Sequence, residues 1–139
     1  MKALPTLVRL AKRELDVLQR ELGELIGKRV NVDTRLAAHD QAIRHEQSLA
    51  ARDYEGARAF SGYIGIALAS RRRLEDEGKD IDTEIERLRG LIQEAHVEMR
   101  KFERLLEIQD EREKVQAERR EDAEMDERAT LRAGRKPLV

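Results

Sequence analysis

The chain has 139 residues, of which 41% are charged and only 3% are aromatic, and it contains no Trp and no Cys. Two Phe and two Tyr residues cannot fill a thick globular core, and the lack of Cys excludes disulfides and thiolate metal sites. The net charge is −1 and acidic and basic residues are interleaved. The chain as a whole therefore has no positive electrostatic potential that would attract nucleic acid or an anionic membrane.

An apolar seam begins near the amino end and advances by alternating steps of four and three residues. Its mean step of 3.5 keeps one stripe of a helix facing a partner helix, which is the geometry of a coiled coil. Only Arg29, His39 and Glu46 interrupt the seam with polar side chains. We therefore predict a helix over about 5–50. The seam positions are Leu4, Val8, Ala11, Leu15, Leu18, Leu22, Leu25, Arg29, Val32, Leu36, His39, Ile43, Glu46 and Ala50.

The stretch after the first seam favours a turn. Asp53 and Gly56 provide a helix cap and a flexible joint, and Gly62 and Gly65 follow shortly after. Each glycine inside a helix costs roughly 1 kcal/mol relative to Ala, so the cluster weakens a helix there. The seam spacing continues through this stretch, so periodicity alone would permit one uninterrupted helix. The local chemistry instead predicts a turn over about 51–57.

A second seam with the same spacing follows this turn and then ends. Beyond its last apolar position the residues in phase are polar, beginning with Gln109 and Glu113. If the chain folds back near Glu55, the numbers of facing residues add to 110, so Leu4 faces Leu106 and the second seam ends where the first arm ends. The second seam comprises Phe60, Ile64, Ala67, Arg71, Leu74, Gly78, Ile81, Ile85, Leu88, Ile92, Ala95, Met99, Phe102 and Leu106.

The predicted fold is therefore all-α, a two-helix antiparallel coiled-coil hairpin that spans 1–139 as a single domain and is a monomer when free. The second helix is expected over about 58–131, with a frayed tail at 132–139. Its last part is polar on every face and overhangs the first helix. A helix that is polar all round is either poorly stable or stabilised by a partner. The same alignment places His39 opposite Arg71 and Gly78 opposite Val32.

The polar residues show no pattern of a catalytic or cofactor site. The carboxylates lie on a solvated face, while general acid–base catalysis needs a partly dry cleft. The three His residues lack metal-ligand spacing, so we predict no metal site. Together with the solvated carboxylates, this predicts no enzyme activity and no cofactor. The basic run 71–73 lacks neighbouring aromatic residues and is followed by acids, which argues against nucleic-acid binding. No segment resembles a signal peptide or a membrane span, and a cytoplasmic location is expected.

Two apolar residues, Tyr63 and Ile66, lie outside the second seam close to the predicted turn. Exposed apolar groups on a charged rod are candidates for a partner site. The alternative is that both side chains only wrap around the turn. The sequence pattern does not separate these two interpretations.

Three features of the chain are shared with a known family: the charged and apolar helix from Leu7 to Leu25, the aromatic start of the second helix from Phe60 to Ile66, and an acidic tail. The tail motif reads Phe102-Glu103-Arg104-Leu105, then Gln109-Asp110-Glu111-Arg112, then Glu124-Met125-Asp126-Glu127-Arg128-Ala129. With these features the chain resembles the FliJ family of flagellar export proteins.

The resemblance implies a stalk-like component of the flagellar type III export apparatus that is not an enzyme. Members of the family insert the open end of the hairpin into the export ATPase hexamer and promote its assembly. They also contact the membrane export gate protein and escort export chaperones. Such a protein would lie at the cytoplasmic face of the inner membrane, at the flagellar base, without direct membrane insertion.

Carried onto this sequence, the resemblance implies two groups of binding residues. The expected ATPase-binding group is Arg9, Arg13, Gln109, Arg112, Met125, Asp126 and Glu127. The expected export-gate-binding group is Tyr63, Ile66, Ser70 and Arg73, of which Ser70 and Arg73 are more polar than the family pattern. Two alternatives stay open: a generic adaptor that dimerises in parallel, and the equivalent stalk protein of a virulence type III secretion system.

Overall fold

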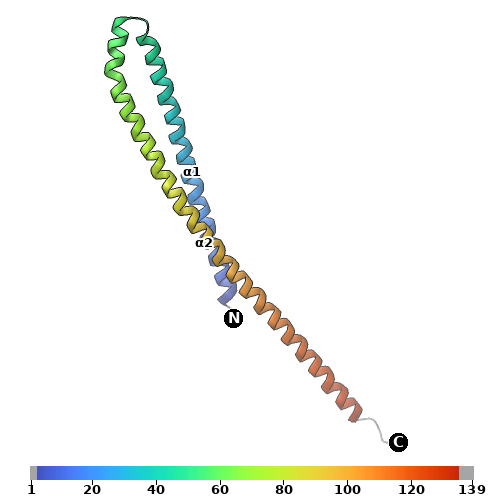
Figure 1. The fold of residues 1–139 in the computed structure, drawn as a ribbon. Helices are drawn as coiled ribbons and strands as arrows, with labels where there is room; N and C mark the ends of the chain where they lie inside the picture. Colours follow the sequence, from blue (N-terminus) through green and yellow to red (C-terminus); the bar gives the residue numbers. More distant parts are fainter. Residues whose placement is uncertain (1–2, 135–139) are drawn as a thin grey trace. The chain divides into compact units, whose positions relative to one another are not determined.

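The structure, a computed structural model, describes residues 3–134, which form two long helices. Helix α1 spans Ala3–Ala50 and helix α2 spans Tyr54–Gly134, with residues 51–53 between them. Figure 1 shows the two helices running in opposite directions from this turn. The all-α antiparallel hairpin is thus confirmed. Of the predicted frayed tail, 132–134 are helical and 135–139 lie outside the described residues.

The turn is shorter than the sequence predicts, because Asp53 caps α2. Its Oδ1 accepts a hydrogen bond from the backbone N–H of Gly56 at 2.6 Å, the usual role of an N-cap residue. The added Cβ of any other residue at Gly56 would lie 2.7 Å from the carbonyl oxygen of Leu49, so the tight turn requires glycine here. Gly62 and Gly65 are accommodated inside α2 and do not interrupt it. The predicted turn over 51–57 is therefore wrong at its carboxyl side.

Two compact units divide the chain, and each contains antiparallel pieces of both helices. One unit is Glu14–Ala95 and includes the turn. The other consists of Met1–Arg13 and His96–Val139, of which 3–13 and 96–134 are described. Every position of both predicted seams is buried or half-buried, which confirms the 3.5-residue period as the determinant of packing. The buried apolar residues are Val8, Ala11, Leu15, Val32, Ala67, Leu74, Ile85 and Leu88.

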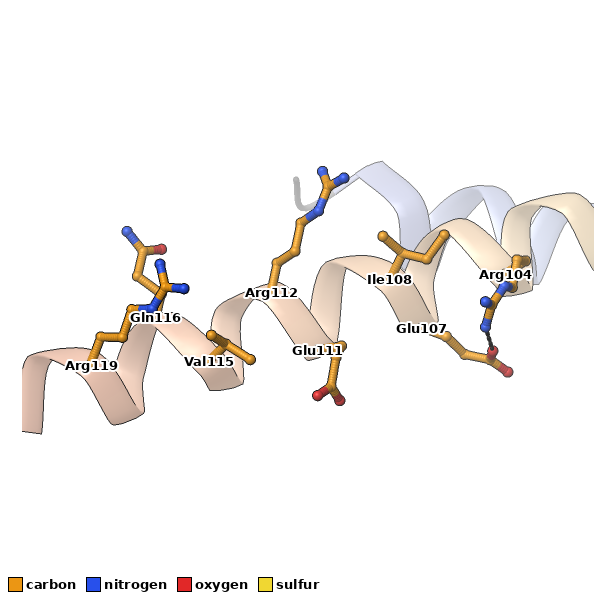
Figure 2. Close-up of a pocket in the computed structure, with 8 residues that line it drawn as sticks. All are labelled: Arg104, Glu107, Ile108, Glu111, Arg112, Val115, Gln116 and Arg119. Atoms are coloured by element: carbon orange, nitrogen blue, oxygen red, sulfur yellow. Dashed lines mark hydrogen bonds and ion pairs between the residues drawn. The ribbon is translucent and has the colours of Figure 1, made fainter. Parts of the chain in front are cut away.

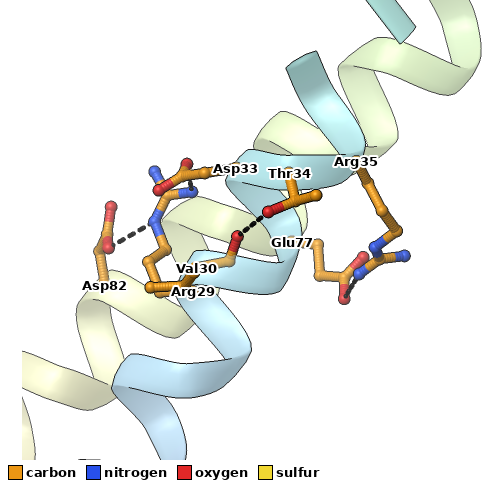
Figure 3. Close-up of polar contacts among 7 residues, drawn as sticks. All are labelled: Arg29, Val30, Asp33, Thr34, Arg35, Glu77 and Asp82. Atoms are coloured by element: carbon orange, nitrogen blue, oxygen red, sulfur yellow. Dashed lines mark hydrogen bonds and ion pairs between the residues drawn. The ribbon is translucent and has the colours of Figure 1, made fainter. Parts of the chain in front are cut away.

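Two arginines within the seams lie between carboxylates of both helices in the unit Glu14–Ala95. Arg29 donates to Asp82 at 2.8 Å across the helices and to Asp33 at 2.7 Å on its own helix (Figure 3). Arg71 donates to Asp40 at 2.6 Å across the helices, and also pairs with the carboxylate four residues further along α2. We call these two groups the arginine clamps. They explain how the seams tolerate charge: the aliphatic part of each arginine side chain lies in the seam, and its guanidinium group forms ion pairs at the surface.

The clamps also define the alignment of the two helices. Both cross-helix pairs, Arg29 with Asp82 and Arg71 with Asp40, have numbers that add to 111, close to the predicted 110. A parallel dimer would instead bring equal positions together, so these pairs exclude that arrangement for this unit. Hydrogen bonding from Arg71 lowers the pKa of Asp40 below its ordinary value, and hydrogen bonding to Asp82 raises the pKa of Arg29.

At two of the predicted facing pairs, the side-chain contacts involve other residues. The side chain nearest to Gly78 is that of Arg29, whose Nη1 would lie 2.7 Å from an added Cβ, so glycine makes room for a guanidinium and not for Val32. The cross-helix partner of Arg71 is Asp40 and not His39. Both differences arise because long arginine side chains reach past their own layer to a carboxylate beside the seam.

Candidate functional site

The described residues offer surfaces for partners, with no cluster suited to metal chemistry. Within 3–134 no group of three or more His, Asp or Glu residues is placed to hold a metal ion. Among the described residues, the groups whose pKa is shifted are Asp40 and three arginines, and each shift follows from hydrogen bonds and charges in ion pairs. No described helix is long and apolar enough to cross a membrane. The candidate sites are therefore faces of the helices.

One side of the helix pair is identified by the ion pair between Arg35 and Glu77. Each of these residues stands immediately before a seam position, and their side chains meet across the helices at 2.8 Å. In the unit Glu14–Ala95, residues that precede a seam position thus share one side of the pair. In the other unit, Lys12 and Glu103 follow seam positions and meet across the helices at 3.8 Å, so there the residues that precede a seam position lie on the side away from this ion pair. Within each unit, this rule assigns other exposed residues to a side.

In the unit made of 3–13 and 96–134, five apolar residues and two arginines on the side away from Lys12 and Glu103 form what we call the terminal face. All of them precede a seam position or its polar continuation, and most are more than one third exposed: Leu10 by 54% and Leu105 by 42%. The face belongs to both helices. Its residues are Leu7, Leu10, Leu105, Ile108, Arg112, Val115 and Arg119.

The α2 part of the terminal face borders a groove of about 710 Å³, drawn in Figure 2. Ile108 and Val115 supply its apolar surface. Arg112 and Arg119 point to one side of α2, while Glu111 points to the other. The groove exists because apolar positions continue along α2 past the amino end of α1, so that Ile108 is only half-buried and Val115 is exposed. It can hold an apolar side chain between charged rims.

The expected ATPase-binding residues do not form one cluster. Gln109 and Arg112 lie together with Leu4 of α1 at a second groove. Arg9 is exposed on α1, where its guanidinium donates to Thr6 at 3.5 Å. Arg13 is also exposed on α1. The tail residues Met125, Asp126 and Glu127 are exposed on α2, and Met125 lies about 20 Å beyond Arg112 at 1.5 Å per residue.

The expected gate-binding residues share one side of α2 in the unit Glu14–Ala95, because each precedes a seam position. Ser70 and Arg73 line a groove of about 350 Å³ together with Arg35 and His39 of α1. Ile66, one turn away, is 72% exposed.

Tyr63 belongs to the same group but is half-buried. The centroid of its ring lies 6.5 Å from the centroid of the Phe60 ring, so Tyr63 partly packs onto the hairpin. This agrees with the alternative interpretation, in which the side chain wraps around the turn. Ile66 has no such role, because it remains largely exposed. Of the two apolar residues near the turn, Ile66 is therefore the stronger candidate for contact with a partner.

Several surface residues are not identified by the sequence reasoning. The contribution of α1 to the gate-side groove, from Arg35, Ala38 and His39, depends on how the helices align. Tyr54, at the start of α2, is 81% exposed. The terminal face was missed although it has a sequence signal, since Leu105, Ile108 and Val115 repeat with seam-like spacing one residue before the seam phase.

Comparison with known families supports the assignment that the residues suggested. The family model described as "Flagellar FliJ protein" matches residues 1–138, nearly the whole chain. Comparisons with curated proteins and with solved structures gave no match. The match covers both helices, the turn between them and the acidic tail. The chain therefore belongs to the flagellar FliJ protein family, a non-catalytic component of the flagellar export apparatus.

Proposed function

We propose that this protein is a stalk that inserts its terminal end into the ring of the export ATPase and promotes ring assembly and ATP hydrolysis. The observation that carries the proposal is the continuation of α2 past α1. Every residue from 111 to 134 is exposed, so none of these 24 residues is buried against another described residue. A helix without a buried stripe gains little from folding alone, and binding to a ring would supply the missing contacts.

The remaining parts of the family role fit other surfaces of the protein. The export gate protein contacts Tyr63, Ile66, Ser70 and Arg73, and the adjoining groove adds Arg35 and His39 to this surface. The export chaperones are escorted by the same rod. The protein acts as a monomer at the cytoplasmic face of the inner membrane. It holds its partners together and performs no chemistry itself.

The test measures ATP hydrolysis by the cognate export ATPase with and without this protein. The full chain is expected to raise the rate and to increase the fraction of assembled rings. A variant that ends at Asp110 keeps both seams but lacks the exposed helix, and it is expected to lose the stimulation. Unchanged hydrolysis and no ring assembly with the full chain would contradict the proposal.

A matched variant separates the two surfaces. Ile66→Ser alters the largest exposed apolar residue of the gate group and leaves the terminal part intact. It is expected to weaken binding to the gate protein in a pull-down assay while ATPase stimulation stays at the wild-type level. Equal loss of both activities would indicate that the two surfaces are not separate sites.

A further inference from the structure

The strongest unassigned feature is the groove of α2 between residues 104 and 119. It combines two apolar side chains, the half-buried Ile108 and the exposed Val115, with a rim of two arginines, Arg112 and Arg119. Neither arginine forms an ion pair with another described residue. On the opposite rim, Glu107 is neutralised by Arg104 at 3.1 Å, which leaves Glu111 as the unpaired carboxylate. The groove therefore has an apolar floor and one basic rim.

We infer that this groove receives an amphipathic helix of a partner, whose apolar stripe carries carboxylates on one flank at a spacing of one heptad. Arg112 and Arg119 are seven residues apart, which corresponds to about 10.5 Å along the helix. A partner helix with acidic residues one heptad apart matches that spacing, and each pair is a charge-assisted hydrogen bond. The inference rests on the proposed function, in which this helix belongs to the export ATPase.

A helix fits the terminal face better than an extended peptide does. Leu7 and Leu105 occupy equivalent positions on the two helices, so the apolar strip runs along both of them near the amino end of α1. A third helix laid beside the pair would cover apolar side chains from both helices at once, as in a three-helix bundle. Beyond the end of α1 the same partner helix would continue along Val115 and Arg119.

The charge of the segment favours a protein partner over a lipid or nucleic-acid surface. Residues 104–119 contain four Lys or Arg and five Asp or Glu, a net charge of −1. Attraction to an anionic membrane or to nucleic acid depends on net positive charge over a patch. A helix packed beside α2 instead pairs its own charged side chains with each of the two arginines, so the position of each arginine matters more than the net charge. An acidic amphipathic helix is therefore the occupant that the charges select.

The test reverses the basic rim and compares it with a matched control. Arg112→Glu with Arg119→Glu changes the groove. Arg72→Glu with Lys79→Glu makes the same change in charge, at the same spacing of seven residues, at exposed residues of α2 in the unit Glu14–Ala95, outside both the groove and the exposed helix 111–134. Affinity for the export ATPase is measured by fluorescence anisotropy. The first variant is expected to bind about tenfold more weakly and the control close to wild type. Wild-type affinity of both variants would overturn the inference while leaving ATPase binding intact.

A second arm needs no ATPase and so separates failure of the inference from failure of the proposed function. Two synthetic three-heptad helices share an apolar stripe, one flanked by Glu and the other by Lys. The Glu peptide is expected to bind the wild-type protein about tenfold more tightly than the Lys peptide. With the reversed rim this preference should invert, which also shows that the groove is still formed. No preference, or binding of phosphatidylglycerol vesicles that depends on Arg112 and Arg119, would overturn the inference.

Discussion

The paired region of α2 and its exposed carboxyl-terminal region have similar composition but opposite environments. Both are helical and rich in charge, and both carry ion pairs or hydrogen bonds between residues three or four apart, such as Arg87 with Glu84 and Thr130 with Asp126. In the first region Leu88 is only 2% exposed, whereas every residue from 111 to 134 is exposed. Helix propensity is thus common to both regions, and the seam alone determines which region packs.

The difference follows from the size of each contribution. Exposed ion pairs along one helix contribute only a few tenths of a kcal/mol each. Full burial of a Leu side chain contributes about 1.5–3 kcal/mol. A long helix can therefore continue on local interactions, but it holds a second helix only where apolar residues recur every 3.5 positions. The exposed region is left available for a partner.

The largest effect should come from removing a seam residue. Leu88→Ala is expected to lower the free energy of unfolding by about 2–5 kcal/mol, because it leaves a cavity between the helices. Leu131→Ala removes the same groups from a side chain that is 55% exposed, and it should change the free energy of unfolding by less than about 0.5 kcal/mol. Urea unfolding followed by circular dichroism measures both. Similar losses would show that the exposed region is packed in solution.

A smaller effect distinguishes two glycines of α2. Gly90→Ala places a methyl group in open space and should stabilise the hairpin by up to about 1 kcal/mol, since Ala favours helix. Gly78→Ala would bring the methyl group to 2.7 Å from Nη1 of Arg29, so the guanidinium group, which donates to Asp33 and Asp82, must shift. The stability gained by Gly78→Ala, measured by thermal unfolding, should be clearly smaller than that gained by Gly90→Ala. Equal gains would mean that the Arg29 clamp contributes nothing to stability.

The smallest effect concerns acid and the Arg71 clamp. The pKa of Asp40 is lower in the folded protein than its ordinary value of 3.8, chiefly because Arg71 donates to the carboxylate. Its contribution to stability is therefore complete above pH 3.8 and is lost as the pH falls through the folded-state pKa.

The corresponding measurement compares the wild type with Asp40→Asn. The wild type should be the more stable protein at neutral pH, and the difference should shrink as the pH falls below 3.8. Glu124→Gln in the exposed region is the control and should show no such change, because Glu124 takes part in no described ion pair. A difference between wild type and Asp40→Asn that stays constant down to pH 2 would contradict the role of the clamp.

The sequence by itself determined the helices, their seams and the direction of the hairpin. The period of 3.5 residues and the end of the second seam at Leu106 required only the order of apolar residues. The family resemblance likewise depended on linear motifs, and the match over 1–138 confirms it. These properties are local or periodic along the chain, so no knowledge of contacts between distant residues was needed.

Only the tertiary structure decided which polar residues meet across the helices. The partners of Arg29 and Arg71, the room that Gly78 leaves for a guanidinium, and the joining of Arg35 and His39 to Ser70 and Arg73 all depend on the exact alignment. Long side chains reach past their own layer, so a facing rule that is correct for the backbone fails for their charged ends. The length of the turn also came from the structure, because the sequence named Asp53 as a cap without showing that α2 begins directly after it, at Tyr54.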